Sequence, residues 1–334
     1  MQPLSNQQRL NLVNTEQLYD SYREALRRDR SHAYGMRWKR IRNVDYLFRE
    51  RDRRGNGRLM GRRSPDTEAI LAAFLAEKSA AKMRLAAIKS RLDEQARLNK
   101  ALRLSRVPEI VGRILRQLDR AGLNDSFTLL GTQSLYAYEA AAGVHFLAEL
   151  LASTDVDLLY DTRAKMTVVS HKMQGKGLLG LLKKADRSFE CIRRQGFRAA
   201  NAGGFMVDLI IAPGSMRDSD PVTFAEDDLV ASEVPGLQWM LNVPKLRTVA
   251  IDEAGWPVPM RSPDPRGFAL HKAWLSQKLD REALKKPRDL AQARAVAEVV
   301  REFMPHLPFA DALTALPEDV RDMFSLLGIE TLTS

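Results

Sequence analysis

The stretch TLLGTQSLYAYEAAAGVHFLAELLASTDVDLLYD, residues 128–161, decides the fold, and FMVDLIIAP, residues 205–213, completes it. The first stretch predicts an apolar strand, a Gly-Thr-Gln-Ser turn, a helix and a second strand. Because side chains alternate along a strand, Asp155 and Asp157 face the same side. Asp208 interrupts an apolar run, where an unpaired charge is costly. Three carboxylates on core strands suggest a divalent cation site.

The composition indicates a globular protein of about two domains, since 334 residues exceed the usual size of one domain. Hydrophobic residues make up 45% of the chain, which is enough for a core. No run approaches the roughly 18–20 apolar residues that cross a membrane, and the N-terminus lacks the pattern of a secretory signal. We therefore expect a cytoplasmic protein without a membrane segment.

The cysteine and histidine residues do not indicate a disulfide or a zinc site. The single cysteine, Cys191, excludes an internal disulfide, and the five histidines are scattered, so the sequence makes no case for zinc. His145, His171 and His271 are interpreted as packed or surface residues.

The positive charge is concentrated at the N-terminus. Residues 1–63 hold 16 Lys and Arg against 7 Asp and Glu, a net charge of +9, whereas the whole chain carries +10. A basic block joined to a nearly neutral body is typical of proteins that bind a phosphate backbone.

Arginines and aromatic residues interleave within this block. A helix over residues 7–30 is followed by MRWKRIRNVDYLFRERDRRGNGRLMGRR, residues 36–63, whose alternation and Gly-Asn-Gly turn predict a β-hairpin or meander. Guanidinium groups hold phosphate and aromatic faces stack on bases. The predicted nucleic-acid-binding residues are Arg37, Trp38, Lys39, Arg40, Arg42, Arg49, Arg51, Arg53 and Arg54. The alternative is a solvated hairpin that packs on the body or meets an acidic protein partner.

A long helix is predicted over residues 66–104, after a start signal at Ser64-Pro65-Asp66. About forty residues span roughly 60 Å. Apolar residues recur along it at intervals of three and four, so one face packs on something. The helix either folds back on its neighbours or pairs with a protein partner.

The rest of the chain mixes helices and hairpins. We expect helices over 108–122, over most of 166–195 and beyond Pro265, and hairpins over 197–211 and 246–261. The predicted divisions are a basic N-terminal region at 1–105, a core at 106–262 and a helical region at 263–334.

Gly131-Thr132 after an apolar strand, Asp155-Val156-Asp157 on the next and Asp208 on a later one resemble the DNA polymerase beta-type nucleotidyltransferase superfamily. More narrowly, residues 127–292 are similar to bacterial nucleotidyltransferase-like proteins related to abortive-infection and toxin-antitoxin types. The resemblance implies an α+β fold: a polymerase beta-like mixed sheet flanked by helices, with a basic helical and hairpin extension and a helical C-terminal part.

The resemblance also implies roles for individual residues. Asp155 and Asp157 would hold two Mg²⁺ ions, and Asp208 would complete the ion on the acceptor side and help to activate the incoming hydroxyl. Gly131 would let backbone approach the triphosphate, while Thr132 and Ser134 would bind its β and γ phosphates. Among basic residues of the C-terminal part, Lys272 matches the family best, with Arg281, Lys285 and Lys286 as further candidates.

The predicted function is transfer of a nucleoside monophosphate from an NTP to a hydroxyl, with Mg²⁺ and release of pyrophosphate. The basic N-terminal block favours RNA, particularly a tRNA-like acceptor. A protein acceptor is an alternative. Another is a non-catalytic toxin-antitoxin component that binds nucleic acid or a partner with the same fold.

Overall fold

The computed structural model describes residues 1–192, 194–214, 221–309 and 316–329. The chain forms two compact units. The N-terminal unit is Val13–Leu98, and the main unit joins Met1–Leu12 to Asn99–Ser334. The predicted regions 106–262 and 263–334 thus share the main unit.

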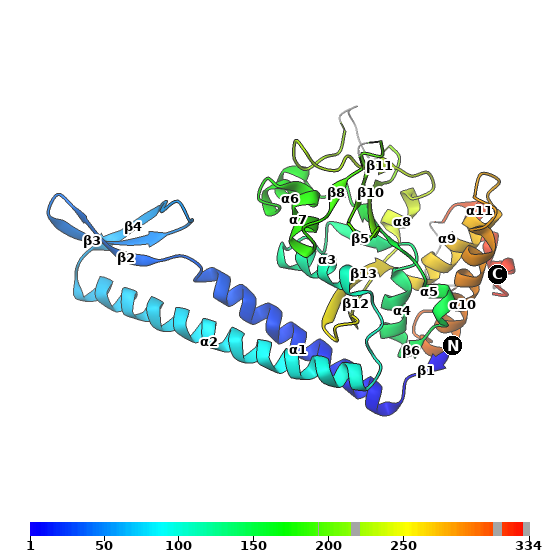
Figure 1. Ribbon diagram of the computed structural model, residues 1–334, viewed down its shortest axis with the longest axis horizontal. Helices are drawn as coiled ribbons and strands as arrows, with labels where there is room; N and C mark the ends of the chain where they lie inside the picture. Colours follow the sequence, from blue (N-terminus) through cyan, green and yellow to red (C-terminus); the bar gives the residue numbers. More distant parts are fainter. Residues whose placement is uncertain (193, 215–220, 310–315, 330–334) are drawn as a thin grey trace. The chain divides into compact units, whose positions relative to one another are not determined.

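Two long helices form the scaffold of the N-terminal unit. Helix α1 (Asn6–Ser31) and helix α2 (Pro65–Ala101) lie side by side (Figure 1). The Gln95 side chain donates a hydrogen bond of 3.1 Å to the Thr15 hydroxyl between them. The long predicted helix therefore folds back on its neighbour within the chain, and a protein partner for α2 stays a prediction.

The same unit contains a three-stranded antiparallel sheet, β2 (Met36–Ile41), β3 (Val44–Glu50) and β4 (Gly57–Arg62), which confirms the predicted meander. Arg42 and Asn43 turn β2 into β3 with φ values of 44° and 64°, as in a two-residue hairpin whose residues both have positive φ. Leu47 and Phe48 of β3 are buried.

A mixed sheet forms the centre of the main unit. Its strands run in the order β5 (Phe127–Leu130), β7 (Asp155–Tyr160), β10 (Met206–Ile211), β9 (Arg198–Ala200) and β8 (Glu190–Cys191), with β11 (Ser232–Glu233) also paired to β10. β7 is antiparallel to β5 and parallel to β10. The apolar residues of β5 and β7, and all those of β10 except the half-buried Met206, are buried, as their sequence predicts. The mixed sheet with flanking helices confirms the predicted α+β class.

Helices and a second hairpin surround this sheet (Figure 1). Strands β12 (Lys245–Ile251) and β13 (Pro257–Pro263) form the predicted hairpin against α4 (Ser134–Ala142). Helices α9 (Pro265–Gln277) and α10 (Lys286–Phe303) pack on each other, and α10 also contacts α4. The other elements are β1 (Gln2–Pro3), α3 (Glu109–Arg120), β6 (Val144–His145), α5 (Ala148–Leu151), α6 (Met166–Lys172), α7 (Gly177–Ala185), α8 (Gln238–Asn242), α11 (Glu318–Arg321) and α12 (Met323–Leu326).

The region 166–195 is less helical than predicted. Gly175 and Gly177 have φ values of 68° and 62°, so the chain leaves the helical conformation between α6 and α7. The Asp228 carboxylate then accepts hydrogen bonds from the amides of Leu178 and Leu179 and fixes the start of α7. The segment ends in strand β8, which the prediction missed. No helix in the described ranges has the length and apolarity to cross a membrane.

Candidate functional site

Strand register brings the three predicted carboxylates together. Asp157 of β7 lies directly beside Asp208 of the parallel strand β10, and Asp155 lies two residues earlier on β7. Because neighbouring residues in register share a face, as do positions i and i+2, all three side chains occupy one face of the sheet. The prediction that they form one acidic group agrees with this register.

The turn after β5 approaches the same point. Leu130 pairs with Asp157 across β5 and β7, and Gly131 follows with a φ of 66°. A Cβ atom on Gly131 would clash with Asp157 Oδ2. Two independent reasons therefore require glycine at position 131: the positive φ and the lack of space for a Cβ atom beside the Asp157 carboxylate. The chain then enters α4 at Ser134.

The carboxylates repel one another. Burial, and then the charges of Asp155 and Asp208, raise the pKa of Asp157 to about 6. Ser153 Oγ donates to Asp155 Oδ1, but no described residue donates a hydrogen bond to the Asp157 carboxylate. A cation at Asp157 would relieve an unbalanced charge.

Asp208 is neutralised within the chain. Arg198 Nε and Nη2 donate to its two oxygens, each at 2.6 Å, in a bidentate ion pair. Arg198 was missed, although the sequence contains a signal: in a hairpin turning at Gly203, Arg198 and Asp208 are equidistant from the turn, and they do pair across β9 and β10. Within the described ranges, no three His, Cys, Asp or Glu side chains form a ready set of metal ligands.

The residues present fit a hard cation at Asp155 and Asp157. Carboxylate oxygens are the ligands that Mg²⁺ prefers. The charges of Lys272 and Arg198 offset the negative charge at Asp157 only in part, because its pKa stays raised. Asp208 is a weaker ligand for such an ion in this conformation, because Arg198 neutralises its charge and donates to both of its oxygens.

A cavity of about 320 Å³ adjoins the carboxylates, a volume at the lower end for small-molecule sites. Its walls come from the sheet, the segment after β11, and helices α8 and α9. They are mostly apolar, with carboxylates on the sheet side and the basic side chains of Lys272 and Arg281 on the side of the C-terminal part. The lining residues are Leu130, Gly131, Asp157, Phe197, Arg198, Asp208, Ile210, Ser232, Val234, Pro235, Leu237, Met240, Phe268, His271, Lys272, Leu275 and Arg281.

The predicted phosphate ligand Lys272 lines this cavity but is already paired. Its ammonium donates to Asp289 Oδ1 at 2.7 Å, and Arg281 donates to Asp289 Oδ2 at 2.7 Å. Burial lowers the pKa of Lys272, while Asp289 opposes this effect. The neighbouring His271 is neutral, because burial lowers its pKa to about 3.

The two predicted hydroxyls have different surroundings. Thr132 Oγ1 accepts hydrogen bonds of 3.2 Å from Arg288 and from Gln292, both on α10. Ser134 Oγ instead donates to the Leu129 carbonyl at 2.9 Å and is fully buried. This position differs from the expected phosphate contact, because the Ser134 hydroxyl holds the turn together. The sequence does not indicate the contact of Arg288 with Thr132, because this contact depends on how α10 packs against α4.

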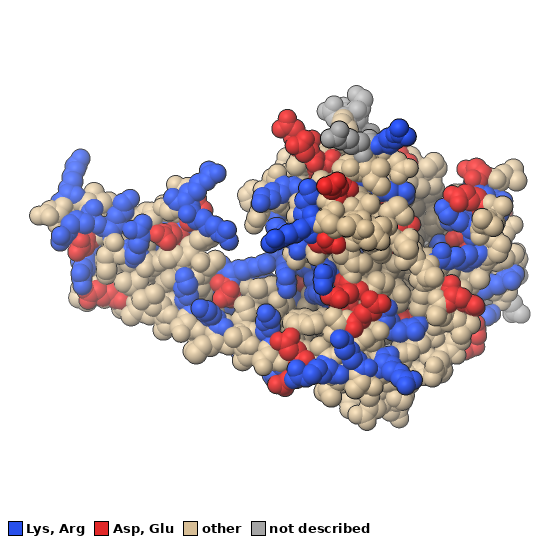
Figure 2. Space-filling view, viewed as in Figure 1, with Lys and Arg blue, Asp and Glu red and all other residues tan. Residues whose placement is uncertain are grey.

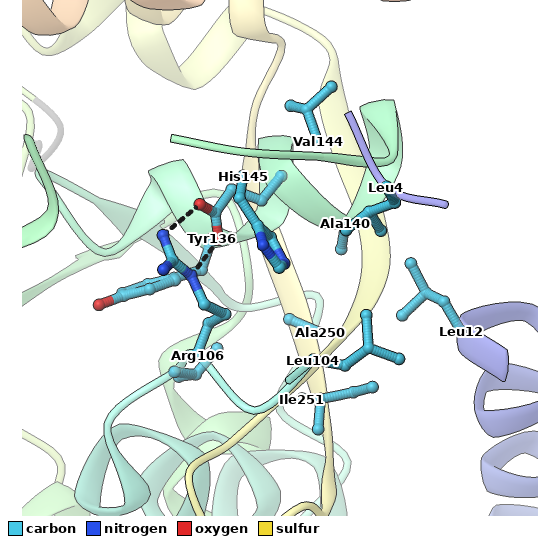
Figure 3. Close-up of a pocket in the computed structure, with 12 residues that line it drawn as sticks. Leu4, Leu12, Leu104, Arg106, Tyr136, Ala140, Val144, His145, Ala250 and Ile251 are labelled. Atoms are coloured by element: carbon cyan, nitrogen blue, oxygen red, sulfur yellow. Dashed lines mark hydrogen bonds and ion pairs between the residues drawn. The ribbon is translucent and has the colours of Figure 1, made fainter. Parts of the chain in front are cut away.

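A second, smaller cavity of about 20 Å³ lies between α4 and β12 (Figure 3). Apolar side chains such as Leu4, Leu104 and Ile251 line it, and Arg106 pairs with the buried Glu139 at its edge. Burial, and then the Arg106 charge, lower the pKa of His145 to about 4. The space holds about one water molecule, so it is not a substrate site.

The predicted basic surface lies on the three-stranded sheet of the N-terminal unit, where Figure 2 shows Lys and Arg side chains projecting into solvent. Its exposed cations are Arg37, Lys39, Arg40, Arg42, Arg51, Arg53, Arg54, Arg58, Arg62 and Arg63. Arg37 and Arg40 form ion pairs with Glu50 and Asp45 yet stay mostly exposed. Asp52 accepts from the amides of Arg54 and Asn56 and so orders the arginine-rich loop.

Two predicted members of this surface have other partners. Arg49 donates to the carbonyls of Ser31, Tyr34 and Gly35, and its guanidinium lies 4.1 Å from the centre of the Phe74 ring. It therefore stabilises the scaffold and is not free for phosphate. The Trp38 ring is covered by the Arg63 guanidinium at 5.1 Å, which leaves it poorly placed for base stacking.

Comparison with known proteins gives one match. A family model described as "Nucleotidyltransferase" matches residues 109–317, which is more than half of the chain and includes the three carboxylates and the Gly131 turn. No curated protein and no solved structure matches significantly.

Replacing Gly131 by alanine tests the contact with Asp157. The added Cβ would displace the Asp157 carboxylate, so we expect the affinity for Mn²⁺ to fall about tenfold, which corresponds to about 1.4 kcal/mol of binding free energy. Gly175→Ala is the matched control, because Gly175 has a similar φ and nothing lies within 4 Å of its Cβ position. Both variants should lose about 1–2 kcal/mol of stability from backbone strain. Equal Mn²⁺ affinities of the two variants would contradict the placement of a cation at Asp157.

Replacing Asp157 by asparagine tests the repulsion between Asp157 and the carboxylates of Asp155 and Asp208. Because the folded-state pKa of Asp157 is raised to about 6, the native protein holds this proton more tightly than the unfolded chain, and ionisation destabilises the fold as pH rises from about 4 to 6. Asp157→Asn should therefore stabilise the metal-free protein at pH 7 by on the order of 2 kcal/mol, and by much less at pH 4. Thermal unfolding at both pH values measures this, and a loss of stability at pH 7 would count against the repulsion.

Proposed function

The chain belongs to the nucleotidyltransferase family and is an enzyme of that class, and from this premise we propose that it moves a nucleoside monophosphate from an NTP to a hydroxyl of a tRNA-like RNA. The observation that carries the proposal is the placement of Asp155, Asp157 and Asp208 on one face of the sheet, beside the Gly131 turn and a cavity.

The reaction breaks one phosphoanhydride bond and forms one ester bond. The acceptor hydroxyl oxygen attacks the α-phosphorus, the bond to the β-phosphate oxygen breaks, and pyrophosphate leaves with the electron pair. The hydroxyl proton passes to a base at the acceptor side. The family resemblance assigns this role to Asp208. Its carboxylate can take the proton only after its hydrogen bonds to Arg198 open.

We assign the metal to the open carboxylates. Asp155 and Asp157 would hold Mg²⁺, which supplies charge stabilisation at the α-phosphate. The predicted second ion would need Asp208 as well. These assignments rest on the charge imbalance at Asp157 and on the family resemblance.

The triphosphate is assigned to the turn between β5 and α4. Gly131 carries no side chain there, and amides at the start of a helix favour anions. Arg288 Nη2 donates to Thr132 at this turn and also to the Ala152 carbonyl, while its buried Nε has no hydrogen-bond partner in the described part of the chain. We therefore add Arg288 to Thr132 as a phosphate ligand and regard Lys272 as an indirect contributor, because Asp289 holds its ammonium.

The RNA acceptor is assigned to the basic surface of the N-terminal unit. Its exposed arginines lie on β2, on β4 and in the loop between β3 and β4, where they can contact successive phosphates. Since arginines cover the Trp38 and Tyr46 rings, phosphate contacts dominate over base stacking. The surface should therefore bind RNA with little base preference.

Transfer is tested by incubating the full chain with each α-labelled NTP, Mg²⁺ and total RNA or cell lysate. We expect label to enter RNA. Asp155→Ala and Asp157→Ala should lower the rate about a thousandfold, since the charge stabilisation that they remove is worth several kcal/mol. Asp227→Ala, which removes an exposed carboxylate, is the matched control and should label at the wild-type rate.

The other results of this experiment are equally informative. Label in protein would identify a protein acceptor and replace the RNA proposal. Absence of label from every acceptor would favour a non-catalytic toxin-antitoxin component. Unchanged labelling by Asp155→Ala would remove the carboxylates from the mechanism.

RNA binding is tested by removing charge from the loop between β3 and β4. The variant Arg51→Ala/Arg53→Ala/Arg54→Ala should bind RNA more weakly and with a shallower salt dependence, by about 0.7–0.9 in log–log slope for each phosphate that the variant no longer neutralises. The control Arg84→Ala/Lys89→Ala/Arg91→Ala removes the same charge from exposed positions of α2. Binding isotherms at several salt concentrations measure both. Equally weakened binding in the two variants would show attraction by net charge alone.

A further inference from the structure

Arg198 is the cation that the chain itself places among the three carboxylates. It faces Asp208 in the register of β9 and β10, and both contacts of the ion pair measure 2.6 Å. The Asp208 side chain is 8% exposed and that of Arg198 is 23% exposed, so the pair is largely shielded from water. Charge-assisted bidentate contacts of this kind are strong and geometrically specific.

This pair divides the carboxylates into two classes. Asp157 receives no hydrogen bond from any described residue, whereas both oxygens of Asp208 are occupied. A divalent ion can therefore approach Asp155 and Asp157 directly. An ion that also uses Asp208 must compete with the Arg198 guanidinium for the same two oxygens.

The released guanidinium would have a new anionic partner nearby. Arg198 and Gly131 line the same cavity, and we have assigned the triphosphate to the Gly131 turn. The Phe197 ring lies 5.5 Å from the guanidinium of Arg198 and supports it on the cavity side. Since Arg binds phosphate and carboxylate oxygens with the same planar geometry, a triphosphate can replace Asp208 as the partner of the guanidinium. The Asp208 carboxylate is then left for a cation to neutralise.

We propose that Arg198 is a positioning residue that keeps Asp208 from binding a cation until an NTP draws the guanidinium onto its phosphates. The free protein then has one strong cation site, at Asp155 and Asp157, and a weak one that includes Asp208. Binding of the triphosphate and filling of the weak site are coupled, so each strengthens the other. This inference rests on the proposed function for the identity of the anion.

Mn²⁺ binding to the full chain tests the inference without measuring catalysis. Titrations at neutral pH, by calorimetry and by the spin resonance of free Mn²⁺, should show one tight ion for the wild type and a second at least tenfold weaker. In Arg198→Met, which keeps an extended side chain against Phe197, the second ion should bind at least tenfold more tightly. Arg198→Lys keeps the charge but loses the bidentate geometry, and should fall between the two.

Arg163→Met is the matched control. Arg163 donates to both oxygens of Asp161, in the same bidentate arrangement but at the opposite end of β7 from Asp155. This variant should bind Mn²⁺ as the wild type does. Asp208→Asn should keep the tight ion and lose the weak one.

The coupling is tested by repeating the titrations with α,β-imido analogues of the four NTPs, which are not cleaved. One analogue should strengthen the second Mn²⁺ site of the wild type at least tenfold and leave that of Arg198→Met unchanged. Wild-type Mn²⁺ binding by a folded Arg198→Met would overturn the proposal. If that variant does not fold, wild-type binding by Arg198→Lys would do so.

Failure of this proposal is distinguishable from failure of the proposed function. Label transfer to RNA with identical Mn²⁺ titrations in wild type and Arg198→Met would leave the function standing and remove the role of Arg198. The expected Mn²⁺ titrations without transfer to any acceptor would support the role of Arg198 and remove the function.

Discussion

Repulsion among three carboxylates on one face of the sheet is the interaction on which the rest of the site depends. Register places Asp157 between Asp155 on its own strand and Asp208 on the next, where burial and like charge raise its pKa. Such an arrangement is costly for a protein that uses it only as structure. The chain offsets one of the three charges with Arg198 and leaves the others beside a glycine turn without a side chain.

The C-terminal helices complete the site from the other side. Helix α10 brings Arg288 and Gln292 to Thr132. Its Asp289 also gathers Lys272 of α9 and Arg281 into one buried ion-pair network. The sheet thus supplies negative groups for a cation, and the helices supply positive groups around the turn assigned to phosphate. In the proposed function, this separation of opposite charges would let a metal–triphosphate pair fit between the sheet and the helices.

Local patterns were sufficient to locate the core strands and the carboxylates, while the α+β fold class followed from the family resemblance that these residues carry. Apolar runs identified β5, β7 and β10, and alternation placed Asp155 and Asp157 on one face. Contacts between distant elements could not be predicted from the sequence. Nothing in the sequence indicates that Arg288 contacts Thr132, 156 residues away. Local composition was also an unreliable guide to individual residues. Arg49 was predicted to bind nucleic acid because its strand is basic and rich in aromatic residues, yet it donates to backbone carbonyls of its own unit.

The central claim is that this acidic site transfers a nucleotide and not a phosphate. Its most direct test follows the two ends of one NTP, labelled at the α-phosphate in one reaction and at the γ-phosphate in another, with Mg²⁺ and RNA. The account predicts α-label in the RNA and γ-label in pyrophosphate, in equal amounts. Label from the γ-phosphate in the acceptor, or release of pyrophosphate without incorporation of the α-phosphate, would contradict it.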